Sequence, residues 1–225
     1  MGCDPAHNGG FVCGVDELPL HTVTLDAYQI AKYEVTNAAY AQCVAAKICK
    51  APYSNASFTR TSYYGNSTYD NYPVIYVDWN QSNTYCAWKG NRLPSEAEWE
   101  KAARGATIQA YPWGDFSATC GLANFWLGTS GCVGDTSAVG SYPAGASTYG
   151  ALDMLGNVWE WVNDWYAGTY YDDPAAGTNP TGPATGYNKV RRGGDFASTG
   201  FYLRDATRGI YPPIYFDRFG FRCAR

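Results

Sequence analysis

The sequence predicts an α+β fold that is poor in regular structure, and three observations lead to that expectation. Segments 35–46, 78–91 and 94–105 carry helix-capping signals. Most of the remaining chain consists of short Tyr-, Val- and Trp-rich stretches separated by Gly, Pro, Asn and Ser. The 225 residues include eight cysteines, an even number that favours disulfides. We therefore expect a single loop-rich, disulfide-stabilised domain spanning residues 1–225.

The first two helices are predicted from the residues that open them. VTNAAYAQCVAA offers Thr36 or Asn37 as the N-cap of an Ala-rich helix. DWNQSNTYCAWKGN offers Asp78 or Asn80 as the N-cap, and Gly90 marks its end. Both segments are therefore expected to be helical, with the precise first residue left open between the two candidates.

The third helix, in PSEAEWEKAARG, has the clearest signals. Ser95 is the predicted N-cap, Glu98 completes a capping box three residues later, and Gly105 is the expected C-cap. Glu96 and Glu100 belong to the same helix. We attribute these carboxylates to helix capping rather than to general acid–base catalysis.

Short strands are expected in the rest of the chain, together with long turns. SYPAGASTYG and DDPAAGTNPTGPATGYN contain so many turn formers that they predict loops instead of strands. No fixed-period repeat and no interior domain boundary is visible. The second half of the chain is therefore expected to be loop-heavy.

Composition excludes several classes of function. A hydrophobic fraction of 46%, with 16% aromatic residues, predicts a folded core. The net charge is −4 and the largest basic cluster is the pair Arg191 and Arg192, so a nucleic-acid partner is not expected. No apolar run is long enough to cross a bilayer, so direct membrane insertion is not expected either.

The spacing of the cysteines favours disulfides in an oxidising compartment. Three pairs are close in sequence and two cysteines are left over: Cys3 and Cys13, Cys43 and Cys49, Cys120 and Cys132, then Cys86 and Cys223. Metal sites would require CxxC knuckles or neighbouring histidines, and the chain has only His7 and His21. We expect an extracytoplasmic, secreted or cell-surface protein. Spacing alone leaves the connectivity open.

Several phrases, in order along the chain, resemble the formylglycine-generating-enzyme (sulfatase-modifying factor) superfamily. They are KYEVTNAAYAQC, GNRLPSEAEWEKAARG, YPWGD, YGALDMLGNVWEWVNDWY, VRRGG and GFRC. The resemblance implies a variant of the C-type lectin fold, with long loops and a tryptophan-rich core. The opening MGCDP is similar to the inside of the family's first strand phrase, so we expect the chain to be part of a longer protein.

The copper site of the family's oxidases is not expected here. In the copper-dependent oxidases that the chain resembles, two cysteines shortly after the RGG phrase bind the metal. In this chain Ser198 occupies the first position, and the second falls near Tyr202 or Leu203. Cu(I) prefers soft sulfur ligands. We therefore expect no catalytic cofactor and a chain that is not an enzyme.

The resemblance also implies two structural features. Cys86 and Cys223 match a pair that family members bridge, which leaves the other three pairs local. The phrase LDMLGNVWEW is similar to a family calcium loop with four ligands, which match the side chains of Asp153 and Glu160 and the carbonyls of Gly156 and Val158. Oxygen ligands of this kind suit structural Ca²⁺. The alternative is a tight turn in which the two carboxylates cap backbone amides.

The last thirty-one residues have an unusual composition. Residues 195–225 contain no Lys, Glu, Gln, Met or Trp, which make up about one in eight of the residues before them. Replacing either adenine of an AAC or AAT codon yields the nine residue types that dominate here and none of the five that are missing. The pattern resembles the variable region of proteins diversified by retroelements, interrupted by residues that we interpret as a framework: Leu203, Arg204, Ala206, Arg208, Arg218 and the GFR phrase.

We therefore predict a ligand-binding protein whose C-terminal hypervariable face, at 195–219, recognises a macromolecule. We expect this ligand to be a protein. Tyr and Phe among small polar residues are typical of antibody-like binding surfaces. The candidate residues are Asp195, Phe196, Ala197, Ser198, Thr199, Gly200, Phe201, Tyr202, Asp205, Thr207, Gly209, Ile210, Tyr211, Ile214, Tyr215, Phe216 and Phe219. The alternatives are a divergent core loop in a binding or structural member of fixed specificity, or an oxidase of the formylglycine-generating type.

Overall fold

The structure, a computed structural model, describes residues 1–225 and contains three α-helices. Helix α1 covers Asn37–Ala45, α2 covers Trp79–Trp88 and α3 covers Glu96–Arg104. Thr36, Asp78 and Ser95 cap them through their side chains, the last two within capping boxes. The helix predictions are confirmed, and the structure decides between the alternative N-caps.

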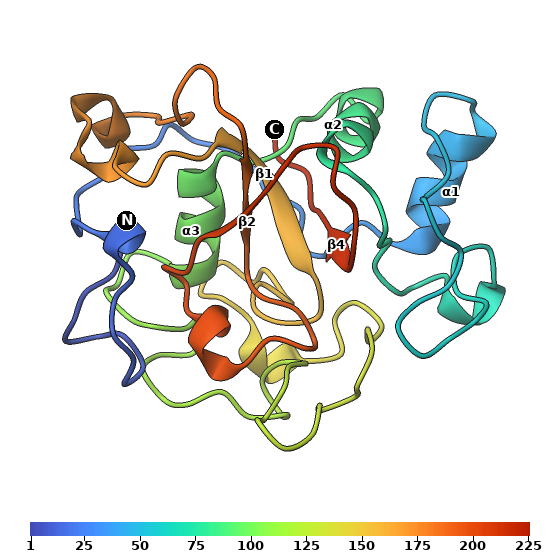
Figure 1. The fold of residues 1–225 in the computed structure, drawn as a ribbon, viewed down its shortest axis with the longest axis horizontal. Helices are drawn as coiled ribbons and strands as arrows, with labels where there is room; N and C mark the ends of the chain where they lie inside the picture. Colours follow the sequence, from blue (N-terminus) through green and yellow to red (C-terminus); the bar gives the residue numbers. More distant parts are fainter.

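A four-stranded mixed sheet forms the centre of the molecule (Figure 1). Its strands are β1 (Trp159–Trp165), β2 (Lys189–Arg192), β3 (Gly209–Tyr211) and β4 (Phe219–Gly220). The order is β3-β2-β1-β4, with β1 antiparallel to β2, β2 antiparallel to β3, and β4 parallel to β1. The last thirty-one residues therefore supply both edge strands of the sheet.

Six short 3₁₀ helices and long loops make up most of the rest. The 3₁₀ segments are Val15–Glu17, Ser67–Tyr69, Pro143–Gly145, Tyr170–Asp172, Pro174–Gly177 and Gly200–Leu203. This loop-rich α+β arrangement confirms the predicted fold class.

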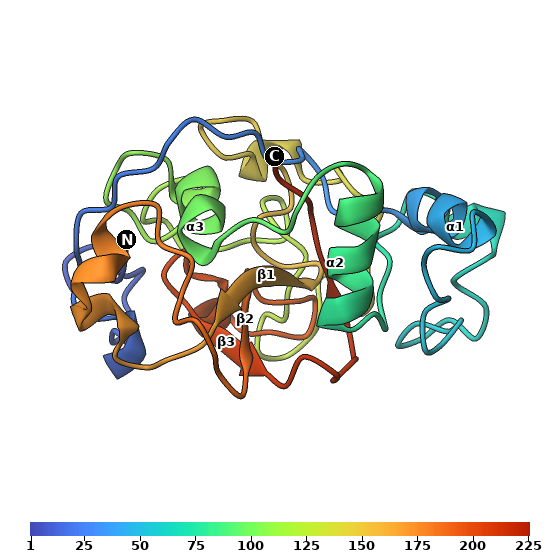
Figure 2. The same ribbon diagram turned by 90° about the horizontal axis from the view of Figure 1, so that it is seen from above.

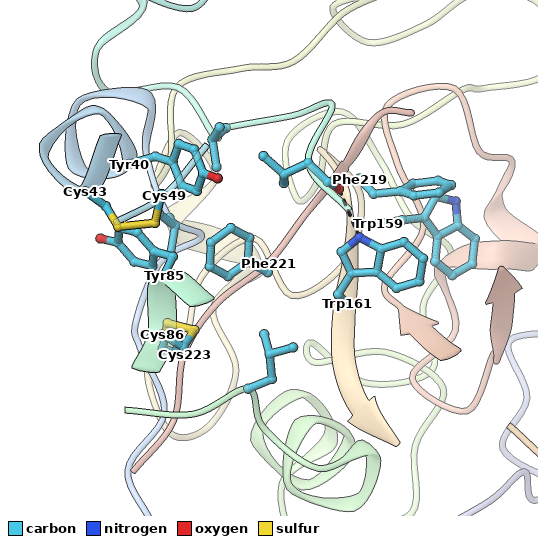
Figure 3. Close-up of a cluster of buried hydrophobic side chains, with 14 residues drawn as sticks. Tyr40, Cys43, Cys49, Tyr85, Cys86, Trp159, Trp161, Phe219, Phe221 and Cys223 are labelled. Carbon is cyan, nitrogen blue, oxygen red and sulfur yellow. Dashed lines mark hydrogen bonds between the residues drawn. A yellow bond between two sulfur atoms is a disulfide. The ribbon is translucent and has the colours of Figure 1, made fainter. Parts of the chain in front are cut away.

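Two hydrophobic clusters lie on either side of β1. Figure 2 shows α2 and α3 flanking that strand. The cluster next to α1 and α2 contains Tyr40, Tyr85, Trp161 and Phe221, and Trp161 also donates an indole hydrogen bond of 3.1 Å to the carbonyl of Val77 (Figure 3). The other cluster packs the α3 side of the sheet. Both clusters use side chains from β1, so this strand is the centre of the core.

All eight cysteines are paired in four disulfides. The pairs are Cys3–Cys13, Cys43–Cys49, Cys86–Cys223 and Cys120–Cys132. The long-range bridge joins α2 to the C-terminal segment, as Figure 3 shows. The predicted pairing is confirmed, both for the local pairs and for the bridge implied by the family resemblance.

Candidate ligand-binding face

The framework residues of the C-terminal segment are buried, except for the half-buried Arg218. All four of its arginines form ion pairs, namely Arg204, Arg208, Arg218 and Arg222. Arg204 donates to both carboxylate oxygens of Glu17 at 2.7 Å. Arg208 donates to both oxygens of Glu96 at 2.8 and 2.9 Å. The guanidinium groups of Arg204 and Arg208 are therefore each held by a bidentate contact, the strongest geometry that such a pair can adopt.

Arg192 fixes the backbone that lies between these two anchors. Its guanidinium contacts Glu100 of α3 and donates to the carbonyls of Asp205, Ala206 and Thr207. Burial opposes ionisation of Glu100, but Arg104 and Arg192 hold the pKa of this carboxyl below its ordinary value. The acidic residues of α3 thus have a structural role beyond helix capping, which their spacing in the sequence does not indicate.

Seven of the predicted ligand-binding residues do not lie at the surface. These residues are buried: Asp195, Phe196, Ser198, Asp205, Thr207, Gly209 and Phe219. Asp205 is fully enclosed without a hydrogen-bond partner for its carboxylate, and burial raises its pKa well above the ordinary value. Because they are buried, these residues cannot touch a ligand in this conformation. The sequence did not reveal this, since the composition of the segment carries no information about which side chains point inward.

The other ten predicted residues are accessible. Thr199, Tyr202, Ile210, Ile214, Tyr215 and Phe216 are exposed, and Ala197, Gly200, Phe201 and Tyr211 are half-buried. Ile214 is 71% exposed and Tyr202 is 47% exposed, which is unusual for side chains of this size and polarity.

These accessible residues form two groups. Thr199, Gly200 and Phe201 line a groove of about 280 Å³ together with Trp126 and Leu127. Phe11 closes that groove on the N-terminal side and contacts Phe201 edge-to-face, with ring centroids 5.7 Å apart. Tyr202 contacts Phe201 edge-to-face, with ring centroids 5.1 Å apart, and connects this groove to a second surface beside the sheet.

That second surface is built on the side of the sheet that faces away from α3. Side chains on a strand alternate between its faces. On β2, Val190 and Arg192 therefore point toward α3, whereas Lys189 and Arg191 point the other way. Cross-strand pairing sets Gly209 opposite Arg191. We call this surface the aromatic face. Its accessible residues are Arg191, Tyr202, Tyr211, Tyr215 and Phe216, and it includes the buried rings of Trp159 and Phe219, which support Arg191.

Rings enclose the guanidinium of Arg191 at the centre of the aromatic face. Its central carbon lies 4.2 Å from the ring centroid of Trp159, 4.5 Å from that of Tyr211 and 4.4 Å from that of Phe219. The rings also contact one another, since Tyr215 stacks on Tyr211 at 4.4 Å. Such contacts attract a cation through the negative faces of the rings.

Two further contacts extend the aromatic face beyond the predicted segment. Tyr202 meets Trp159 edge-to-face at 6.2 Å. Phe216 stacks on Tyr53 with centroids 3.9 Å apart. Sequence reasoning did not identify Trp159, Arg191 or Tyr53 as site residues. Strand alternation in KVRR could have placed Arg191 on one face, but nothing local to Tyr53 indicates its position.

The residues implied for copper do not fit that metal. The Ser198 hydroxyl donates to Asp195 at 2.7 Å, Leu203 is fully buried, and every cysteine is in a disulfide. Cu(I) requires soft ligands, and no thiolate is present to supply them.

The residues implied for calcium fit only in part. Both oxygens of Glu160 accept hydrogen bonds from Arg222 at 2.6 to 3.0 Å, and Trp99 donates to one of them. Glu160 is therefore committed to an ion pair and is not available as a ligand. Asp153 retains one buried carboxylate oxygen without a partner, and burial raises its pKa. Ca²⁺ binding by the predicted set, the side chains of Asp153 and Glu160 and the carbonyls of Gly156 and Val158, stays a prediction, and it would require Glu160 to release Arg222.

One further group has ligand atoms close together. Cys3, Cys13 and Glu17 place their ligand atoms within 4.8 Å of one another. Both sulfurs are in a disulfide and both Glu17 oxygens accept from Arg204, so this cluster is explained by covalent and ionic bonds of the fold.

The loop-rich α+β fold around a small mixed sheet places the protein in the class of C-type lectin-like folds. Residues 6–225 match the family of the sulfatase-modifying factor enzyme 1-like domain. The chain belongs to this family, and the resemblance inferred from its ordered phrases is confirmed.

Named relatives agree with this family. The chain is 40% identical over 168 residues to the formylglycine-generating enzyme of Thermomonospora curvata, covering 68% of this chain and 55% of the relative. It is 35% identical over 223 residues to the serine/threonine-protein kinase Pkn1 of Chlamydia trachomatis, covering 93% of this chain and 35% of the relative. The chain thus spans about half, or less, of the curated relatives that it matches.

Two solved structures show the same fold over most of the chain. PvdO from Pseudomonas aeruginosa has a TM-score of 0.80 at 28% identity and covers 100% of this chain and 89% of its own. Treponema denticola variable protein 1 has a TM-score of 0.71 at 25% identity and covers 91% of this chain and 86% of its own. The second match agrees with the predicted resemblance to variable proteins.

The prediction that the chain is not an enzyme is wrong. Formylglycine-generating enzymes from Thermomonospora curvata and Streptomyces coelicolor are each 40% identical to it. The prediction rested on Ser198 and on the missing thiols, and the absence of one family's metal ligands is too narrow a basis for excluding catalysis as a whole.

The disulfides and the helices bear on location. Four disulfides indicate an oxidising, extracytoplasmic environment. None of the helices has the length and apolarity that crossing a membrane would require.

Proposed function

We propose that the protein binds a macromolecular ligand, a protein, through the aromatic face and the adjacent exposed residues of the segment 195–219. The observation that carries the proposal is the contrast within this segment. Its exposed positions are large and apolar, while the framework residues between them are buried in ion pairs. Exposed rings clustered on a rigid support are typical of protein interfaces.

The rigidity of the support favours diversification of the exposed positions by a retroelement. Substitutions at exposed sites away from caps and core usually change stability little. Ile210, Ile214, Tyr215 and Phe216 can therefore vary while Arg204 and Arg208 hold the backbone. The fold shared with a protein named as variable supports the same interpretation. We propose that the protein is secreted or displayed at the cell surface, where such a ligand is accessible.

Population sequencing tests this function. The segment encoding residues 190–225 would be sequenced deeply in the native population, and the adjoining DNA searched for a near-copy. We expect changes at adenine positions of the copy, confined to codons of accessible residues such as Thr199, Ile210 and Tyr215. An invariant segment without a neighbouring copy would remove diversification and leave a binding face of fixed specificity.

A second candidate is catalysis, which the relatives named formylglycine-generating enzyme favour. The test is incubation of the protein with a cysteine-containing peptide, oxygen and copper, followed by mass spectrometry for the aldehyde product. Formation of formylglycine would establish this activity and would require ligands other than thiolates. An unchanged peptide would exclude that reaction for this chain.

A further inference from the structure

We infer that Arg191 is a fixed anchor for a carboxylate group of the ligand, so that the aromatic face recognises an acidic side chain or a C-terminus of a partner protein. This inference rests on the proposed function and specifies the chemistry of the ligand. It is carried by the surroundings of the guanidinium, which supply rings but no hydrogen-bond or salt-bridge partner.

Arg191 is exceptional among the arginines that pack on the sheet. Arg192, Arg208 and Arg222 each have a carboxylate within hydrogen-bonding distance. Arg191 takes part in none of the salt bridges of the structure. Its Nε is buried without any hydrogen-bond partner. An enclosed cationic donor left unpaired is costly. The terminal nitrogens of the same guanidinium also make no internal hydrogen bond, and they are the donors that a ligand can reach.

The neighbouring lysine on the same strand shows how a cation on this face is otherwise satisfied. Lys189 lies over the rings of Trp79 and Trp165 at 4.0 and 3.9 Å. Its ammonium group also donates to the carbonyl of Asn163 at 2.7 Å. Both cations on this face of β2 therefore have aromatic neighbours, but only Lys189 has an internal acceptor.

The shape of the site also suits a bidentate acceptor. Arg191 is half-buried, and its terminal nitrogens are not among the enclosed polar atoms that lack a partner, so they reach the surface. Burial lowers the pKa of Arg191 to about 10, which still leaves the guanidinium charged at neutral pH. A planar guanidinium fixed by rings presents two parallel N–H groups, the arrangement that matches a carboxylate.

Gly209 keeps this arrangement open. A Cβ atom added at Gly209 would lie 2.7 Å from Cγ of Arg191 and 2.9 Å from its Nε. It would also lie 2.9 Å from the ring of Trp159. Any side chain at this position therefore displaces the arginine or the ring, so the identity of one residue in the segment 195–219 decides whether the anchor is present.

The experiment compares benzoate with benzamide, which have the same shape and differ in charge. Binding would be followed by two-dimensional NMR of the ¹⁵N-labelled protein, at the Trp159 indole N–H and the Arg191 Nε–H. We expect saturable shifts with benzoate and binding of benzamide weaker by about tenfold or more, because a charge-assisted bidentate contact is lost. Equal shifts with the two probes, or none with either, would overturn the inference.

Matched variants separate the anchor from general effects of charge. Arg191→Met is expected to abolish the preference for benzoate, whereas Arg191→Lys keeps the charge but loses the fork and should retain only part of it. Arg225→Met removes an exposed guanidinium elsewhere and should leave the preference intact. Retention of the preference in Arg191→Met would contradict the assignment. Because population sequencing tests diversification independently, the anchor can fail while the proposed function stands.

Discussion

Residues 203–208 and residues 210–216 are neighbours in the chain, yet they are stabilised in opposite ways. The first stretch is buried throughout, and Arg204 and Arg208 are each bound by a carboxylate. The second is half-buried or exposed throughout, and its rings contact one another, Tyr53 and the buried ring of Phe219. The difference teaches that the backbone of a segment can be fixed while many of its side chains remain free to change. Buried residues hold the backbone in place, and other, exposed residues form the surface.

The largest expected effect comes from removing an ion pair of the buried framework. Arg222→Met leaves Glu160 as an uncompensated buried carboxylate, and we expect a loss of about 3–5 kcal/mol in the free energy of unfolding. Urea denaturation followed by circular dichroism measures this loss. Arg225→Met, at an exposed arginine, is the control and should change stability by less than about 0.5 kcal/mol. Similar losses in both variants would break the distinction between framework and surface.

The disulfides provide a second comparison, between a long loop and a short one. Cys86–Cys223 spans 137 residues and Cys43–Cys49 spans 6. In the chain-entropy description, replacing the first pair by serine should cost about 2–3 kcal/mol more than replacing the second. Denaturation midpoints of the two double variants give this difference. Equal costs would show that the bridges act through packing of the folded state instead.

The buried carboxyl of Asp164, on the α3 side of the sheet, should make the free energy of unfolding depend on pH. Burial raises the pKa of Asp164 to about 8, and nearby Glu96 adds to this effect while Lys189 opposes it. The folded state then binds a proton that the unfolded state releases above its ordinary pKa near 4. The contribution is therefore fully present below about pH 4 and is lost as pH rises through about 8.

The variant Asp164→Asn removes this contribution and therefore tests it. The variant should lose less stability than the original chain between pH 5 and 8, where the slope is at most about 1.4 kcal/mol per pH unit. Denaturation at several pH values measures both slopes. Identical slopes would mean that Asp164 ionises in the folded state as readily as in the unfolded chain.

The sequence predicted the parts of this comparison that depend on local rules. Capping residues such as Ser95 gave the helices, and the spacing of the cysteines with the family resemblance gave the disulfides. The composition of residues 195–225 also distinguishes the framework arginines from their neighbours. The inward direction of Phe196 and Asp205 was not predictable, because the segment has no regular period to assign its faces. Tyr53 was not predictable either, because it joins the site by stacking on Phe216, which is far from it in the sequence.

The smallest expected effect belongs to the exposed residues, and it is the most informative one for the proposed function. Ile214→Asn, at a side chain that is 71% exposed, should change the free energy of unfolding by less than about 0.5 kcal/mol. Phe216→Ala removes one stacked pair and should cost about 0.5–1.5 kcal/mol. Denaturation of the two variants beside Arg222→Met ranks all three. If Ile214→Asn cost as much as the framework variant, the exposed segment would itself be structural, and a surface whose residues cannot change without unfolding the protein could not be diversified.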